Sequence, residues 1–183
     1  FARCENLNNL DVSGFDTSKG TDFSNIFSGC SSLTSIDVSG FDTSNAIDLS
    51  GFFDGCQGPT ELDVTNFVTA NAVVMNNMFS KCSGLREIDL SNFDTSNVAT
   101  MAGMFAHCYE LVKIDISNFN TEKVENMSHM FYSCMALETL DVSGFKTANV
   151  TTMSDMFENC KRITLLDVSK FDTSNVTSMR GMF

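Results

Sequence analysis

Apolar side chains alternate with polar ones over a short stretch that recurs every 26 residues along the chain. Counted from the cysteine that opens each repeat, the apolar positions of this stretch are +6 and +8. Position +6 holds Leu10, Ile36, Leu62, Ile88, Ile114, Leu140 and Leu166, and position +8 holds Val12, Val38, Val64, Leu90, Ile116, Val142 and Val168. Alternation with a period of two predicts short parallel strands near residues 9–13, 35–39, 61–65, 87–91, 113–117, 139–143 and 165–169.

The apolar period changes in the second half of each repeat. Val98, Met101, Met104 and Cys108 lie three, three and four residues apart, and the same spacing recurs over residues 150–160. Such spacing places the side chains on one face of a short helix, α or 3₁₀. A strand and a helix in every repeat indicate a coil that buries its apolar face only against neighbouring coils.

The repeat frame is unbroken along the chain, because the seven cysteines Cys4, Cys30, Cys56, Cys82, Cys108, Cys134 and Cys160 are spaced 26 apart. We therefore expect an α/β solenoid of seven coils, with a parallel sheet on one face and short helices on the other; a parallel β-helix is the alternative. The expected repeats are 4–29, 30–55, 56–81, 82–107, 108–133, 134–159 and 160–183. Residues 1–183 would form a single array, and Phe1 and Phe183 share one repeat position, so we expect a fragment of a longer chain.

Two further columns of the repeat predict packing and turns. Position +11 is phenylalanine in every repeat: Phe15, Phe41, Phe67, Phe93, Phe119, Phe145 and Phe171. We predict that these rings stack on one another as a continuous column. A polar corner follows, typically D-T-S-N as in residues 94–97, and its threonine occurs in all seven repeats. Such residues bond nearby backbone groups at turns.

Charge and hydropathy restrict the partners of the chain. The formal net charge is −12, from 23 acidic and 11 basic side chains, and no basic stripe is present. This balance argues against nucleic acid as a partner, because no cluster of positive charges could replace its counterions. No apolar run approaches the roughly 18 residues of a spanning helix, so we expect no direct membrane insertion by this segment.

The residues that usually carry catalysis or bind metals are not grouped in the sequence. The cysteines occur singly, with no C-x-x-C pair, and we expect free, buried thiols rather than disulfides or a zinc site. The methionines are interpreted as core residues, and His107 and His129 occupy different repeat positions, so neither is a predicted ligand. We expect no cofactor, no metal and no enzymatic activity, because a repeat multiplies each group and assembles no unique catalytic centre.

One exposed column suggests a binding function. Position +7 is an aspartate in every repeat: Asp11, Asp37, Asp63, Asp89, Asp115, Asp141 and Asp167. It lies between two inward apolar positions, so its side chain points outward, and position +9 on the same face is serine or threonine. Seven carboxylates arranged in one column repel one another. Three explanations remain open: hydrogen bonds from neighbouring hydroxyls and amides together with raised pKa values, a cation such as Ca²⁺ between carboxylates, or a basic or sugar-like partner.

The motif M-F-x-x-C-x-x-L-x-x-L-D-V-S-x-F-x-T-x-N-V covers the chain and is nearly complete in Phe79–Met104 and Phe131–Met156. Its L-x-x-L-x-L core is a leucine-rich-repeat signature. The whole motif resembles the bacterial surface protein 26-residue repeat of the BspA-like leucine-rich-repeat surface proteins. The resemblance implies a right-handed, leucine-rich-repeat-like array, exposure at the cell surface or outside the cell, and adhesion or binding of host proteins. It also implies that the aspartate column lies on a concave sheet.

We therefore expect a surface interaction or adhesion module that binds a protein or glycan on the concave acidic face. The alternative is a structural spacer or assembly subunit of a filament or large complex, without a ligand of its own. Position +5 varies between repeats, as in Glu61, Lys113 and Leu165, which favours binding, whereas the uniform aspartate column favours a spacer. Uncapped ends would also allow association between arrays.

Overall fold

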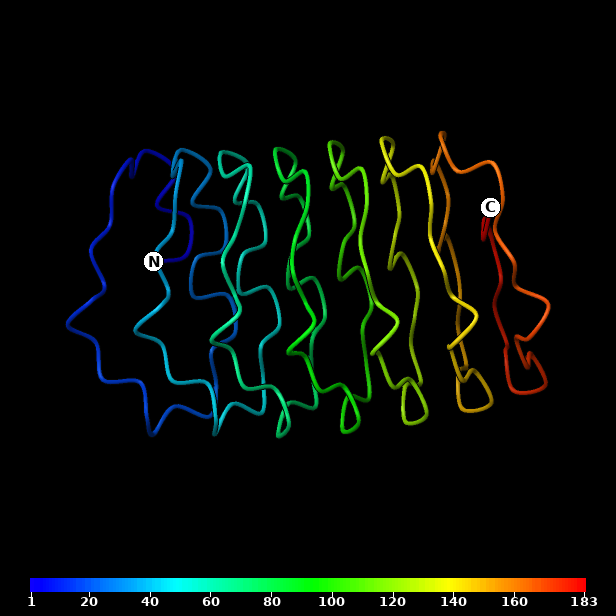
Figure 1. Ribbon diagram of the computed structural model, residues 1–183. Helices are drawn as coiled ribbons and strands as arrows, with labels where there is room; N and C mark the ends of the chain where they lie inside the picture. Colours follow the sequence, from blue (N-terminus) through cyan, green and yellow to red (C-terminus); the bar gives the residue numbers. More distant parts are fainter.

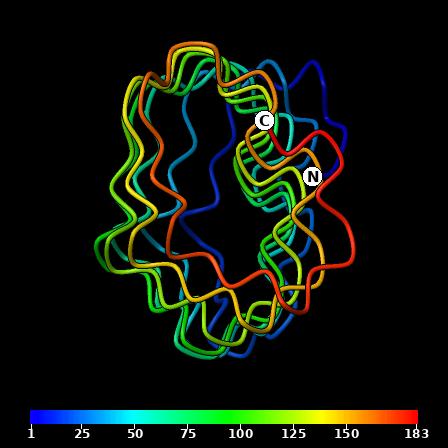
Figure 2. The ribbon, with the colours of Figure 1, turned by 90° about the vertical axis from the view of Figure 1, so that its right-hand side faces the viewer.

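In the computed structural model, residues 1–183 form a row of stacked coils, one coil for each repeat (Figure 1). Viewed along the row, the coils superimpose as a closed outline (Figure 2). Backbone hydrogen bonds join each coil to the next: the N–H of Phe27 donates to the carbonyl of Phe52 at 3.0 Å, and the N–H of Phe53 donates to that of Met78 at 2.9 Å. The repeat character predicted from the sequence is therefore present in the structure.

The predicted secondary structure is wrong. The chain contains no helix, and its only strand-like pairings are six isolated parallel bridges, which link Asp22, Asp48, Val74, Thr100, Asn126, Thr152 and Ser178 in succession. These residues occupy position +18, far along the repeat from the strands predicted around positions +5 to +9. An α/β solenoid with a parallel sheet and helices is excluded, and the parallel β-helix alternative also lacks its sheets. The chain has no helix of the length and apolarity needed to cross a membrane.

Left-handed residues prevent a helix in the second half of each coil. Positive φ values recur at position +21, as in Asn77 (φ 55°) and Gly103 (φ 64°), and at position +25, as in Lys81 (φ 55°) and His107 (φ 62°). A right-handed helix needs negative φ at every residue. The segment instead forms consecutive tight turns, whose remaining N–H groups donate to the next coil. We call residues +18 to +25 of each coil the turn ladder.

The predicted strands fail because their backbone groups are used locally or remain unpaired. The N–H of Ser91 donates to Oδ1 of Asp89 in the same coil, and the N–H of Phe93 closes a turn onto Leu90. No N–H of residues 87–90 donates to another backbone carbonyl. A side chain that captures a nearby N–H competes with ladder formation. The alternation of the sequence is nevertheless a burial pattern, since Ile88 and Leu90 are buried and Asp89 is exposed.

The stacked aromatic column lies at a different position from the one predicted. The +11 phenylalanines from Phe41 to Phe145 are buried, but no two of the seven pair with each other. The continuous stack is formed by the phenylalanine three residues before each cysteine, with neighbouring centroids 5.6–6.0 Å apart and ring planes within 16°. Its members are Phe1, Phe27, Phe53, Phe79, Phe105, Phe131, Phe157 and Phe183.

Two side-chain ladders add hydrogen bonds between coils. The buried Thr95 hydroxyl donates to the carbonyl of Asn120 at 2.9 Å and accepts its N–H at 2.8 Å. The same arrangement recurs from coil to coil, and it confirms that the threonine of the polar corner bonds backbone groups. Each thiol from Cys30 to Cys160 donates to the carbonyl of the stacked phenylalanine in the preceding coil.

Candidate functional site

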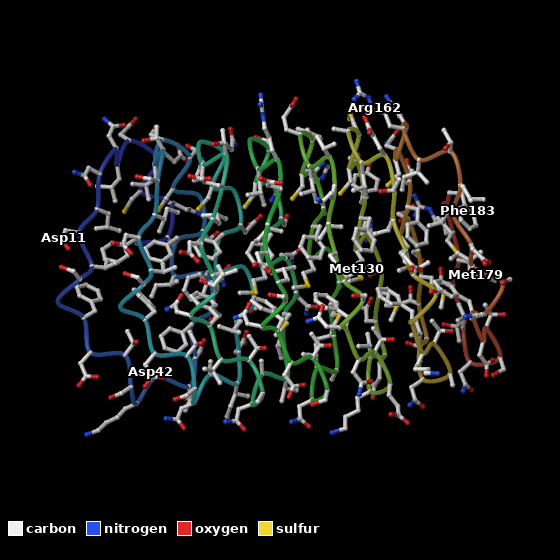
Figure 3. The ribbon with its side chains drawn as sticks, viewed as in Figure 1. Asp11, Asp42, Met130, Arg162, Met179 and Phe183 are labelled. Atoms are coloured by element: carbon white, nitrogen blue, oxygen red, sulfur yellow. The ribbon has the colours of Figure 1, made fainter.

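The predicted aspartate column lies on the outside of the stack, and all seven side chains are exposed. Asp11 is labelled at one end of the row in Figure 3. Each Oδ1 accepts the backbone N–H of the serine or threonine two residues later, at 2.8–3.1 Å. In Asp11 and Asp63 the hydroxyl of that residue also donates, at 2.7 and 2.6 Å. The hydrogen bonds expected for this column are therefore present, and they are local to each coil.

The expected rise of the aspartate pKa values is wrong. The hydroxyl and then the backbone N–H of Thr65 lower the pKa of Asp63, and the backbone N–H and then the hydroxyl of Ser91 lower that of Asp89. Donors stabilise the charged carboxylate. Repulsion from the aspartate of a neighbouring coil opposes this effect but is smaller, as for Asp115 acting on Asp89. All seven pKa values are lowered, so the column is ionised at neutral pH.

A groove runs beside the aspartate column across the middle coils. Its volume is about 630 Å³, and its floor is formed by Ile36, Leu62, Ile88 and Ile114 from four successive coils. An adjoining depression of about 490 Å³ continues it toward the last coil. We call the two together the acidic groove. Five carboxylates and one ammonium line the first part, namely Glu61, Asp63, Glu87, Asp89 and Asp115 with Lys113.

A second cluster was not anticipated from the sequence. The chain has two histidines and two tyrosines. All four lie together on the turn side of neighbouring coils: Tyr109 Oη is 3.0 Å from His107 Nδ1, and Tyr132 meets the ring of His107 at 5.0 Å and that of His129 at 5.5 Å between centroids. We call these four residues the His–Tyr cluster. They occupy four different repeat positions, so a column-by-column comparison could not bring them together.

Charged side chains surround the His–Tyr cluster. Nε2 of His129 lies 3.2 Å from Oδ2 of Asp155, which is largely buried. Burial lowers the pKa of His107, and the positive charges of Lys81 and His129 lower it further. A polar depression of about 460 Å³ lies against the cluster, and its lining includes Glu158.

Neither the acidic groove nor the His–Tyr cluster contains a group of side chains arranged to bind a metal ion. No three histidine, cysteine, aspartate or glutamate side chains are grouped so that they could bind a metal ion. The aspartates of successive coils form no such group, so the calcium explanation has no geometric support.

Comparison with known proteins gives one match. The model of a family described as "Mycoplasma protein of unknown function, DUF285" matches residues 1–114, 48–164 and 110–183. The chain belongs to this family. The overlapping matches fit a repeat protein and do not single out the BspA-like group. No curated protein and no solved structure matches the chain.

Proposed function

We propose that the chain is a binding module whose acidic groove holds an extended, basic segment of a partner protein. The observation that carries the proposal is the groove itself, with an apolar floor between rows of carboxylates. A partner segment that alternates basic and apolar side chains would place the apolar ones on the floor and pair the basic ones with carboxylates. Opposite charges of this kind accelerate association and select the partner.

Three properties of the groove support an occupant of this type. Its aspartates are charged at neutral pH, as the ordinary pKa of an aspartate requires, and local hydrogen bonds lower these pKa values further. The backbone N–H groups of residues 87–90 make no hydrogen bonds within the protein, and two of these residues, Glu87 and Asp89, are exposed to a partner. The groove walls also differ between coils, because Glu61, Glu87 and Lys113 occupy position +5. A surface that differs along its length can fix the register of a bound chain.

The binding test uses an alternating Lys-Leu peptide as probe and the matched Glu-Leu peptide as its control. We expect the Lys-Leu peptide to bind and the Glu-Leu peptide not to. The triple variant Asp63→Asn, Asp89→Asn, Asp115→Asn should bind at least tenfold more weakly, because it removes three groove charges and keeps the oxygen that each turn needs. Fluorescence anisotropy of a labelled peptide measures both affinities.

A matched control separates the groove from net charge. Asp42, Asp94 and Asp172 accept the N–H of a serine two residues later, as the groove aspartates do, but they lie at the polar corner outside the groove. Asp42 projects from one edge of the stack in Figure 3. Changing these three to asparagine alters the net charge equally and should leave peptide affinity within about twofold. Equal losses in the two triple variants would defeat the proposal.

The spacer function remains the second candidate, and the aspartate column favours it. Every aspartate bonds its own turn in the same way, as a purely structural role requires. A spacer predicts that neither triple variant changes any binding, while Asp→Ala changes at the same positions lower stability.

Exposure at the cell surface belongs to the same proposal. It is supported by the resemblance of the repeat to bacterial surface proteins. Protease treatment of intact cells should remove the protein, and complete protection of it would contradict the proposal.

A further inference from the structure

The polar depression beside the His–Tyr cluster is separate from the acidic groove, and their linings share no residue. Its volume of about 460 Å³ is within the roughly 300–1,000 Å³ of small-molecule sites. His107, His129 and Tyr132 line it together with acidic and basic side chains. Binding at this depression can therefore be tested independently of binding in the acidic groove.

The rings of the cluster are not required by the fold. Other coils place Asn25, Gly51 and Asn77 at the repeat position of His129, and Gly55 and Lys81 at that of His107. These positions need a left-handed backbone, which glycine and asparagine adopt readily. Likewise, Tyr132 replaces residues as small as Ser28, Ser80 and Ala106 in its column. Two histidines at left-handed positions and a tyrosine in a column that holds serine or alanine in other coils converge on this depression, which indicates a binding role.

The backbone holds the cluster in place. The N–H of His107 donates to the carbonyl of Tyr132 at 2.7 Å, that of Tyr132 to His129 at 3.0 Å, and that of His129 to Ser154 at 2.9 Å. Side chains on a rigid element lose less freedom on binding a ligand.

The charges of the depression favour a neutral ligand. Lys81 is already paired with Asp54 at 3.3 Å, and Asp155 with His129 at 3.2 Å. An anion would meet the carboxylates of Asp155 and Glu158, whereas a cation would meet the ammonium of Lys81 and the guanidinium of Arg180. The lining is also too polar for an apolar molecule, since two of its ten residues are hydrophobic.

We propose that the His–Tyr depression binds a neutral sugar, presented as a residue of a glycan chain. A sugar carries many hydroxyls, each of which donates and accepts. The carboxylates of Asp155 and Glu158 accept hydroxyl donors, and the Arg180 guanidinium donates to hydroxyl oxygens. Tyr132, which is half-buried, offers ring surface to the C–H groups of the sugar.

The composition of the chain supplies its own reporter. Tryptophan is absent, and both tyrosines and both histidines lie in the cluster, so tyrosine fluorescence and the two histidine Cε1 proton resonances report on this site. The probes are the methyl glycosides of glucose, galactose, mannose and N-acetylglucosamine, with chitotriose as a chain. We expect a saturable change with at least one of them. If chitotriose binds and the methyl glycosides do not, the ligand is a glycan chain. If both bind, the site also accepts single sugars.

Two variants and two charged probes make the test decisive. Tyr132→Ser restores the residue of coils with Ser28 or Ser80 and should weaken binding at least tenfold, with unchanged thermal stability as the check on folding. The groove variant Asp63→Asn, Asp89→Asn, Asp115→Asn should bind sugar as the parent does. Absence of a saturable response to every neutral probe would overturn the proposal. So would saturation by inorganic phosphate or tetramethylammonium alone, or full sugar affinity in Tyr132→Ser.

Discussion

At the scale of single residues, the aspartates of the groove use one carboxylate oxygen for a turn and leave the other without a partner in the protein. Oδ1 closes a turn in its own coil, as Asp89 does with Ser91, and no protein hydrogen bond to Oδ2 is present in the column. The turn explains why every repeat has an aspartate at this position without any reference to a ligand. The exposed charge is then available for a partner, so a uniform column and a binding surface are compatible.

The turn aspartates predict how stability depends on pH. Their folded-state pKa values lie below the unfolded value of about 3.9, so the unfolded chain binds protons first as pH falls. Stabilisation is complete above that unfolded value and is lost as pH falls through the folded pKa values. We expect the melting temperature to fall most steeply below about pH 4. The variant Asp63→Asn, Asp89→Asn, Asp115→Asn should show a shallower fall, and an identical pH profile would contradict this account.

At the scale of elements, the turn ladder replaces the helix that hydrophobic spacing predicted. At the left-handed position +21, asparagine and glycine alternate along the first coils: Asn25 is followed by Gly51, and Asn77 by Gly103. Oδ1 of each asparagine lies against the glycine of the next coil, where a Cβ would collide with it. The glycine is therefore needed for two reasons, its positive φ and the side chain beside it.

A double-mutant cycle separates these two reasons. Gly51→Ala should lower the free energy of unfolding by about 1–2 kcal/mol from the left-handed backbone alone, plus a contribution from the contact with Asn25. In an Asn25→Gly background the same change should cost only the backbone part. Urea unfolding of the four proteins measures the coupling. Equal costs of Gly51→Ala in both backgrounds would show that the contact with Asn25 contributes nothing.

At the scale of the whole molecule, each coil is covered by its neighbours. The cysteines illustrate this dependence: Cys30 to Cys134 are buried, Cys160 is half-buried and Cys4 is exposed. The expectation that all seven thiols are buried is thus wrong for Cys4. Figure 3 shows Met130 in the interior of the row, whereas Phe183 lies at its end and is 71% exposed.

Thiol reactivity should follow the same gradient. Burial raises the pKa of Cys56 to about 12 and that of Cys160 to about 11, and it raises those of Cys82, Cys108 and Cys134 as well. The thiolate is the reactive form. In the native 183-residue chain we expect Cys4 to react with a thiol reagent at once, Cys160 slowly, and the others only on unfolding. Mass spectrometry of labelled peptides measures the order, and early labelling of Cys82 or Cys108 would contradict the stack.

The sequence alone determined the repeat length, the stacking of equivalent residues and the identity of most core positions, because burial follows the apolar period whatever the backbone does. Val98, Met101 and Met104 are buried as predicted, although none of them lies in a helix. The left-handed turns were also detectable, since position +21 contains only Asn, Gly, His and Asp. The apolar spacing of a helix outweighed that signal in the prediction.

Only the tertiary structure decided where the backbone hydrogen bonds run and which surface residues meet. The N–H of Ser91 can bond either a neighbouring coil or Asp89, and local sequence does not rank the two. His107, Tyr109, His129 and Tyr132 belong to different repeat columns, and stacking brings them together because neighbouring coils are hydrogen-bonded side by side along the turn ladder. A property that depends on contacts between coils is absent from any single repeat, and both proposed binding surfaces are of this kind.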